Sequence, residues 1–141
     1  MLVRLMYCSR AAAGVDSEEL SLLLRQCRSH NGEAGITGML CFSEGLFIQV
    51  LEGGRSAVNQ LYQRILRDPR HHDVVLLVYE EISQRRFAGW TMGQVNMARI
   101  NTAMLLKYSE RPTLDPYSVS GHVTLALFDE LLATAAMVGD R

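Results

Sequence analysis

The residue that most clearly indicates chemistry is Gln49, in the middle of the apolar stretch LFIQVLEG. Side chains alternate between the two faces of a strand, so Gln49 points to the same face as Phe47 and Leu51. If that face is covered, each amide group without a partner costs about 1–3 kcal/mol. A carboxamide donates hydrogen bonds at one end and accepts them at the other. The pattern therefore predicts a polar group opposite Gln49.

Three side chains on other predicted strands are candidates to meet Gln49. Alternation along LVRLMYC puts Tyr7 on the more uniformly apolar face of the first strand. In GWTMGQVNM the same two-residue rule puts Trp90 and Met92 on one face. A phenol, an indole and a thioether are each common in ordinary cores, so the glutamine is the unusual member. We expect all four side chains to converge under the predicted helices.

Two polar clusters follow those helices. HNG, with His30 and Asn31, comes after the first helix, where Asn and Gly are ordinary C-terminal residues. RDPRHHD places Arg70, His71 and His72 after the second helix. Neighbouring side chains diverge on a regular element, so the two histidines do not suit a single metal ion. HNG is therefore either an ordinary helix end or a functional segment. RDPRHHD is either a solvated turn or a loop that contacts a phosphate or ribose.

The elements that must position these residues follow from hydrophobic periodicity. Strand patterns occur at residues 2–8, in the two halves of 35–53, at 73–82 and at 89–97. A first helix is predicted from an Asp16 cap to about Ser29, and a second from a Ser56 cap to Pro69. The order β-α-β-β-α-β-β predicts a ferredoxin-like α+β sandwich: a mixed five-stranded sheet with both helices on one face.

The pattern changes after about residue 97. A short helix, two prolines and a last helix follow, and the last helix has an apolar stripe formed by Leu127, Phe128, Leu131 and Leu132. We therefore expect an α+β domain over residues 1–97 and a C-terminal helical extension over 98–141. The apolar stripe must pack either on the open face of the sheet or on another subunit.

Composition excludes several classes of partner. A chain of 141 residues is one domain by length, and its formal net charge of -1 argues against nucleic acid or anionic membrane as a partner. No stretch approaches 18 apolar residues, so we expect no membrane span. The three cysteines have no metal-like spacing, which indicates free thiols in a reducing cytoplasm.

Taken in order, YCSR, HNGEAGITGMLCFSEGLFIQVLEG, RDPRHHD and RRFAGWTMG resemble the BLUF domain, a blue-light sensor that uses flavin. The resemblance covers about residues 1–97. It implies a photoreceptor rather than an enzyme, with a flavin held between the two helices and its ring edge against the sheet. FAD is the expected cofactor, with FMN or riboflavin as alternatives, and no metal is implied.

The resemblance also implies roles for individual residues. Tyr7 would give an electron and a proton to the excited flavin, and Gln49 would relay the proton and then return rotated or as a tautomer. Trp90 and Met92 would pass the signal on. The implied cofactor-binding residues are Tyr7, His30, Asn31, Phe47, Gln49, Asp68, Arg70 and His71.

The same resemblance implies output through the C-terminal helices, a homo-oligomer interface or an unknown downstream protein. The residues themselves leave two other functions open. One is a flavin- or nucleotide-binding regulatory module without photochemistry, and the other is a phosphoryl-transfer enzyme that uses Arg70, His71 and Asp73. A thiol-redox sensor is weaker, because Cys8, Cys27 and Cys41 all lie in apolar stretches of predicted elements, where thiols are generally inert.

Overall fold

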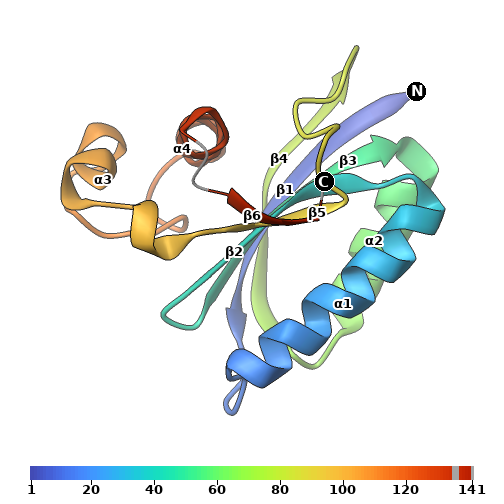
Figure 1. Cartoon of the computed structure of the whole chain (residues 1–141), viewed down its shortest axis with the longest axis horizontal. Coiled ribbons are helices and arrows are strands. Elements are labelled where there is room, and N and C mark those ends of the chain that lie inside the picture. Colours follow the sequence, from blue (N-terminus) through green and yellow to red (C-terminus); the bar gives the residue numbers. More distant parts are fainter. Residues whose placement is uncertain (135–136, 141) are drawn as a thin grey trace.

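One mixed β-sheet with helices on both faces organises the chain (Figure 1). The computed structural model describes residues 1–134 and the backbone of 137–140. The strands are β1 (Leu2–Ala11), β2 (Thr37–Ser43), β3 (Leu46–Gly54), β4 (His71–Ile82), β5 (Met92–Val95) and β6 (Met137–Asp140). The helices are α1 (Ser17–Ala34), α2 (Arg55–Arg67), α3 (Thr102–Tyr108) and α4 (Gly121–Ala133), with a short 3-10 helix, η1 (Met97–Arg99).

The sheet confirms the predicted α+β class and adds one strand to it. Its order is β4-β1-β3-β2-β5-β6, and only the β2–β5 pair is parallel among the described strands. All five predicted strands are present, and β6 joins them as a sixth by pairing antiparallel with β5. The C-terminal extension is accordingly not purely helical: its last described segment completes the edge of the sheet.

Strand register places the two most informative residues side by side. Tyr7 of β1 lies opposite Gln49 of β3, and Leu40 of β2 lies on the other side of Gln49. The close approach of β2 to β3 needs a glycine, because a Cβ at Gly38 would lie 2.0 Å from the Val50 carbonyl oxygen. The two strands predicted within 35–53 are β2 and β3, and they pair antiparallel.

Helix α1 ends later than predicted, and α2 has a different N-cap residue from the one predicted. Asp16 caps α1 as expected, accepting a hydrogen bond from the Glu19 amide at 2.9 Å. However, α1 continues past Ser29 and ends only at Gly35, which has φ 71°. His30 and Asn31 therefore project from a helix rather than from a turn. The predicted Ser56 cap was wrong, since Gly54 holds the N-cap position of α2 without a side-chain hydrogen bond.

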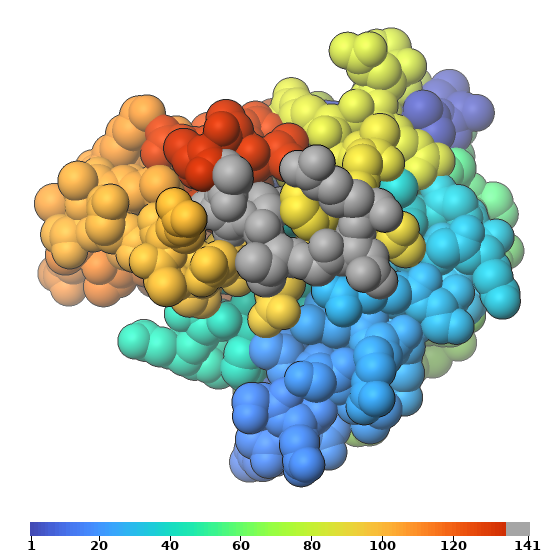
Figure 2. All heavy atoms as spheres, in the orientation of Figure 1, coloured from blue at the N-terminus to red at the C-terminus, as the bar shows by residue number. Residues whose placement is uncertain are grey.

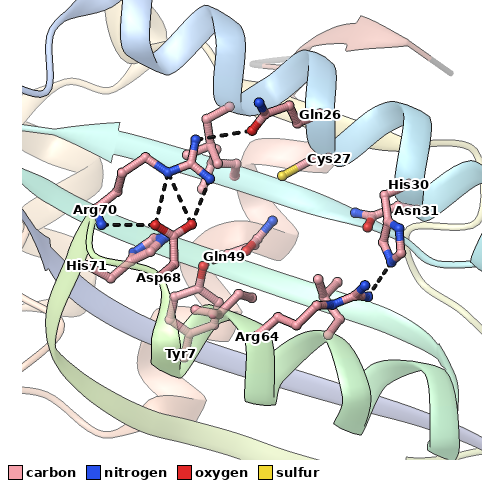
Figure 3. A pocket seen from close by; sticks show the side chains of 14 residues that line it. Tyr7, Gln26, Cys27, His30, Asn31, Gln49, Arg64, Asp68, Arg70 and His71 are labelled. Atoms are coloured by element: carbon pink, nitrogen blue, oxygen red, sulfur yellow. Dashed lines mark hydrogen bonds and ion pairs between the residues drawn. The ribbon is translucent and has the colours of Figure 1, made fainter.

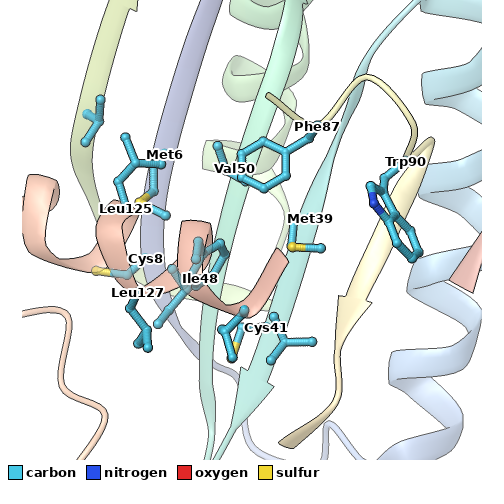
Figure 4. Close-up of a cluster of buried hydrophobic side chains, with 14 residues drawn as sticks. Met6, Cys8, Met39, Cys41, Ile48, Val50, Phe87, Trp90, Leu125 and Leu127 are labelled. Carbon is cyan, nitrogen blue, oxygen red and sulfur yellow. The ribbon is translucent and has the colours of Figure 1, made fainter. Parts of the chain in front are cut away.

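The sheet separates two apolar cores. Helices α1 and α2 cover one face, where Val3, Leu5, Phe47 and Leu51 are buried. Helix α4 covers the other face, where its side chains meet Met6, Ile48 and Val50 (Figure 4). The apolar stripe of the last helix thus packs on the open face of the sheet: Leu127, Phe128 and Leu131 are buried there, and Leu132 packs against the same cluster.

Trp90 and Met92 lie on opposite faces of the sheet, so the prediction that they share one was wrong. Strand β5 begins only at Met92, and Trp90 belongs to a turn in which its amide donates to the Phe87 carbonyl oxygen at 3.0 Å. The two-residue rule does not apply across that turn. The Trp90 ring packs in the core beneath α4, near Gly93, whereas Met92 is buried beneath α1 and α2.

A buried ion pair connects three strands and the segment between β4 and β5. Arg4 lies opposite Glu52 in the β1–β3 register and contacts it at 2.7 Å, while its other guanidinium nitrogen contacts Glu80 at 2.7 Å. The Glu52 carboxylate is fully buried and also accepts hydrogen bonds from the amides of Arg86 (3.1 Å) and Phe87 (2.7 Å). Glu52 thereby fixes the segment that leads to Trp90 against β3.

Among the described residues, no helix is both long enough and apolar enough to cross a bilayer.

Because Glu52 has three polar partners in a buried site, we expect Glu52→Gln to lower the free energy of unfolding by about 3 kcal/mol, the usual result of breaking a buried ion pair from one side. Glu81→Gln is the matched control, since its ion pair with Arg55 is half exposed and should contribute less than about 1 kcal/mol. Urea unfolding at pH 7 measures both changes. Equal effects of the two substitutions would contradict a structural role for the Glu52 cluster.

Candidate functional site

A cavity of about 270 Å³ lies on the sheet between α1 and the α2–β4 side (Figure 3). Of the eight side chains that the sequence assigns to a cofactor, seven line it: Tyr7, His30, Asn31, Gln49, Asp68, Arg70 and His71. Residues from Tyr7 to His71, which belong to different elements of the chain, thus meet at one site. Phe47 does not line the cavity, and neither Trp90 nor Met92 does.

The floor of the cavity carries a chain of two polar contacts that joins three side chains. The Tyr7 hydroxyl donates to Gln49 Oε1 at 2.5 Å, and Gln49 Nε2 donates to the Met92 thioether at 3.4 Å. Burial, with smaller contributions from nearby Cys27 and Asp68, raises the pKa of the Tyr7 phenol well above its ordinary value. Tyr7 is therefore a neutral donor at physiological pH, and the amide of Gln49 connects it to β5.

Asn31 marks the place where a polar ligand is needed. Its side chain is fully buried in the last turns of α1, and neither Oδ1 nor Nδ2 has a hydrogen-bond partner within the described part of the chain. Each such group costs about 1–3 kcal/mol, and buried polar groups in native proteins nearly always have partners. A ligand in the cavity with a donor and an acceptor on one edge would satisfy both atoms.

Asp68 and Arg70 form the polar rim at one end of the cavity. Arg70 binds the Asp68 carboxylate through Nε (3.0 Å) and Nη2 (2.7 Å), and its Nη1 donates to Gln26 of α1 at 3.2 Å. Burial alone would raise the pKa of Asp68, but the hydrogen bonds from Arg70 outweigh it and lower that pKa. The rim therefore carries a charged pair that is partly shielded from water and spans from the β4 side to α1.

His71 is held beside the phenol by its neighbours. Its Nδ1 lies 2.7 Å from Ser9 Oγ, and its ring centroid lies 6.0 Å from that of Tyr7 and 4.7 Å from that of Phe47. Burial lowers the pKa of His71, so its imidazole is neutral at pH 7. The buried Phe47 ring is thus a support for His71 rather than a wall of the cavity.

The opposite end of the cavity is bridged by His30 of α1 and Arg64 of α2, whose side chains contact each other (Figure 3). Helix α1 is therefore tied across the cavity at both ends, by Arg70–Gln26 and by Arg64–His30. These contacts are partly exposed, so they can exchange for contacts to a ligand at little cost.

Apart from apolar residues of the lining, sequence reasoning missed Gln26, Cys27 and Arg64. Cys27 was expected to be an inert core thiol, yet its sulfur points into the cavity (Figure 3). Its spacing from Asn31 was the available signal, because residues four apart lie on one face of a helix. Cys41 and Cys8, in contrast, are buried in the core on the other face of the sheet.

Asp73 does not join this site. It has a positive φ of 51°, is largely exposed, and pairs with Arg10 at 3.6 Å. Arg70 and His71 line the cavity without it. The arrangement thus lacks the third member on which the phosphoryl-transfer hypothesis relied.

Comparisons with known proteins identify the family. The model of the family "Sensors of blue-light using FAD" (BLUF) matches residues 2–93. The photoactivated adenylate cyclase subunit beta of Euglena longa is 39% identical over 92 residues, which are 64% of this chain and 11% of that protein. The chain spans 11–16% of the length of the curated relatives of this kind.

Solved structures resemble the whole chain. BlsA in its photo-activated state has a TM-score of 0.86 and 26% identity over 100% of this chain and 99% of that one. The dark-state structure of BlrB, a BLUF protein, has a TM-score of 0.76 and 31% identity over 95% and 96% of the two chains. Because the family model matches residues 2–93, which are more than half of the chain, the chain belongs to the BLUF family, whose members sense blue light with FAD.

Proposed function

We propose that Tyr7 and Gln49 are the photochemical pair of this blue-light sensor, and that residues 98–141 pass its state to a partner. The observation that carries the proposal is the 2.5 Å hydrogen bond between the two side chains on the floor of the cavity. A binding module without photochemistry would need the cavity and Asn31, but it would need no phenol buried against an amide.

The flavin, when bound, supplies a strong oxidant on excitation by blue light. Tyr7 would give one electron to that oxidant, and the hydroxyl of the oxidised phenol would then be strongly acidic. Its proton leaves along the hydrogen bond to Gln49 Oε1, which is already formed in the ground state. Tyr7 is restored when electron and proton return. The lasting change is in Gln49, whose amide ends in a different orientation or tautomer.

Asn31 and the two ends of the cavity are proposed to hold the flavin. The unpartnered amide of Asn31 suits the polar edge of the ring system, which carries donors and acceptors. His30, Asp68, Arg70 and His71 lie at the ends of the cavity, where the chain that extends from the ring would pass. Phe47 contributes by supporting His71 from behind.

We propose that the signal crosses the sheet through β3 and β5. Met92 contacts the Gln49 amide, and its carbonyl accepts a hydrogen bond from Arg28 of α1 at 3.2 Å. On the other face, Arg86 pairs with Asp129 of α4 at 2.8 Å, and Figure 2 shows α4 beside the segment that follows β4. In this proposal Trp90 responds as part of the core beneath α4 rather than as a neighbour of the flavin.

Residues 1–97 are proposed to be the sensor and 98–141 its output segment, which acts on a second copy of the chain or on a downstream protein. We place the protein in the cytoplasm, because its three cysteines are unpaired thiols, as reducing compartments favour.

The purified protein should be yellow, and its flavin band should move reversibly to longer wavelength under blue light. Tyr7→Phe and Gln49→Leu should each keep the flavin and lose this red shift, because the first removes the donor and the second removes the amide. Each should also lower the free energy of unfolding by about 1–3 kcal/mol, since it strands the buried partner. Tyr7→Phe/Gln49→Leu together should be closer to neutral.

Tyr62→Phe is the matched control for these variants. The Tyr62 ring lies 5.9 Å from that of Tyr7, but its hydroxyl makes no hydrogen bond with the described residues of the site. Difference absorption spectra should show a normal light response in this variant. A normal response in Gln49→Leu would instead assign Gln49 a structural role only.

Asn31→Leu should stabilise the flavin-free protein and should weaken its binding of flavin. Removal of two unpartnered polar atoms should raise the free energy of unfolding of the flavin-free protein by about 1 kcal/mol or more. The same change should weaken flavin binding, because the hydrogen bonds to the ring edge are lost. Thermal melts of apoprotein and titration with FAD measure the two effects. Destabilised apoprotein together with unchanged FAD affinity would remove Asn31 from the binding site.

Illumination should change amide hydrogen exchange in α4 and in residues 83–91, while α2 keeps its dark protection. The reason is that the Glu52 and Asp129 contacts connect the strand of Gln49 to these segments. Exchange compared in the dark and under continuous blue light tests this route. If no difference extends beyond residue 97, the C-terminal extension is not the output.

A further inference from the structure

Two sulfur atoms from different elements lie near the Gln49 amide. The thioether of Met92 approaches from β5, 3.4 Å from Gln49 Nε2. The thiol of Cys27 approaches from α1, and Figure 3 shows its sulfur directed into the cavity toward the same end of the amide. The Gln49 side chain lies close enough to Cys27 to lower the pKa of its thiol, although burial outweighs that effect. Gln49 is therefore bounded by a phenol at one end and by two sulfurs at the other.

The two sulfurs are not equivalent as partners. A thioether only accepts hydrogen bonds, whereas a thiol both donates and accepts. In the structure, the amide nitrogen of Gln49 faces Met92 and its oxygen faces Tyr7. The amide N–H groups therefore need only hydrogen-bond acceptors on the side of the two sulfurs. If the amide turned over, its oxygen would face the sulfurs, and Met92 could offer it nothing. Cys27 is the neighbour on that side that carries a proton.

We propose that Cys27 is a positioning residue for Gln49, and that its S–H group stabilises the turned amide and thereby prolongs the light-adapted state. This inference rests on the proposed role of Gln49 in the light response. It gives Cys27 a role, whereas the roles proposed above for the other cavity residues do not involve it.

The surroundings of Cys27 suit a neutral donor. Burial raises the pKa of the thiol above its ordinary value, and the opposing effects of Arg70 and Gln49 are smaller. The thiol therefore keeps its proton at neutral pH. Independent support for a ligand at this point comes from Asn31, one turn further along α1, whose buried amide is unpartnered among the described residues and lines the same cavity.

The test compares the thermal recovery of the illuminated holoprotein in three variants. Cys27→Ala removes the donor, so its red-shifted state should decay about fivefold faster, the change that one hydrogen bond of ordinary net strength makes in a rate constant. Cys27→Ser keeps a donor, and its red-shifted state should decay no faster than that of the unmodified protein. Cys41→Ala is the control, because it truncates a thiol of the opposite core, and its decay should stay within about twofold.

A second measurement uses the unmodified protein, so the test survives if a variant loses its flavin. The light-minus-dark infrared difference spectrum should contain an S–H stretching band that shifts to lower frequency in the light and is absent in Cys27→Ser. Recovery in Cys27→Ala equal to that of the unmodified protein, or an unchanged S–H band, would overturn the role of Cys27 while leaving the photoreceptor intact. A protein that binds FAD without any red shift would instead overturn the proposed light response itself.

Discussion

The hydrogen bond between Tyr7 and Gln49 is the interaction on which the rest of the site depends. It exists because β1 and β3 pair in a register that puts these residues opposite each other. A slip of either strand by one residue would move its member of the pair to the other face. Both groups are buried, so neither can turn to water when its partner is lost. A phenol and an amide thus remain in contact on the floor of a cavity that is otherwise largely apolar.

The same register gives the two faces of the sheet different tasks. One residue in two along β1 and β3 faces α1 and α2, where Tyr7 and Gln49 lie. The alternate residues face α4, and among them Arg4 and Glu52 form the buried ion pair. Since Gln49 and Glu52 are only three residues apart on one strand, a shift of β3 at the cavity is also a shift at the segment that holds Phe87.

Packing makes the C-terminal extension part of the sensor's structure. Leu127, Phe128 and Leu131 share a core with Met6 and Ile48, so α4 is anchored by apolar burial to strands that also carry the site. The polar contact between Arg86 and Asp129 is exposed and adds little stability, which suits a contact that changes during signalling. Because apolar burial holds α4 on the sheet while its polar contact is weak, small changes in the sheet can shift the conformational equilibrium of α4.

Local sequence determined much of this protein. Alternation along LFIQVLEG and LVRLMYC was enough to predict that Gln49 and Tyr7 face one covered surface, and helical periodicity was enough to predict the apolar stripe of α4. These patterns depend only on the geometry of single elements. The resemblance to the BLUF family then named seven residues that line the cavity.

Tertiary structure decided what those patterns could not. Trp90 was assigned to the face of Met92 because the start of β5 cannot be read locally, and a turn at Phe87 sends the indole to the other core. Helix α1 continues through His30 and Asn31 because contacts with the sheet override their weak helix propensity. Cys27 became a cavity residue only once α1 was placed over Gln49. In each case the deciding contact joins residues far apart in the chain, and no local pattern contains that information.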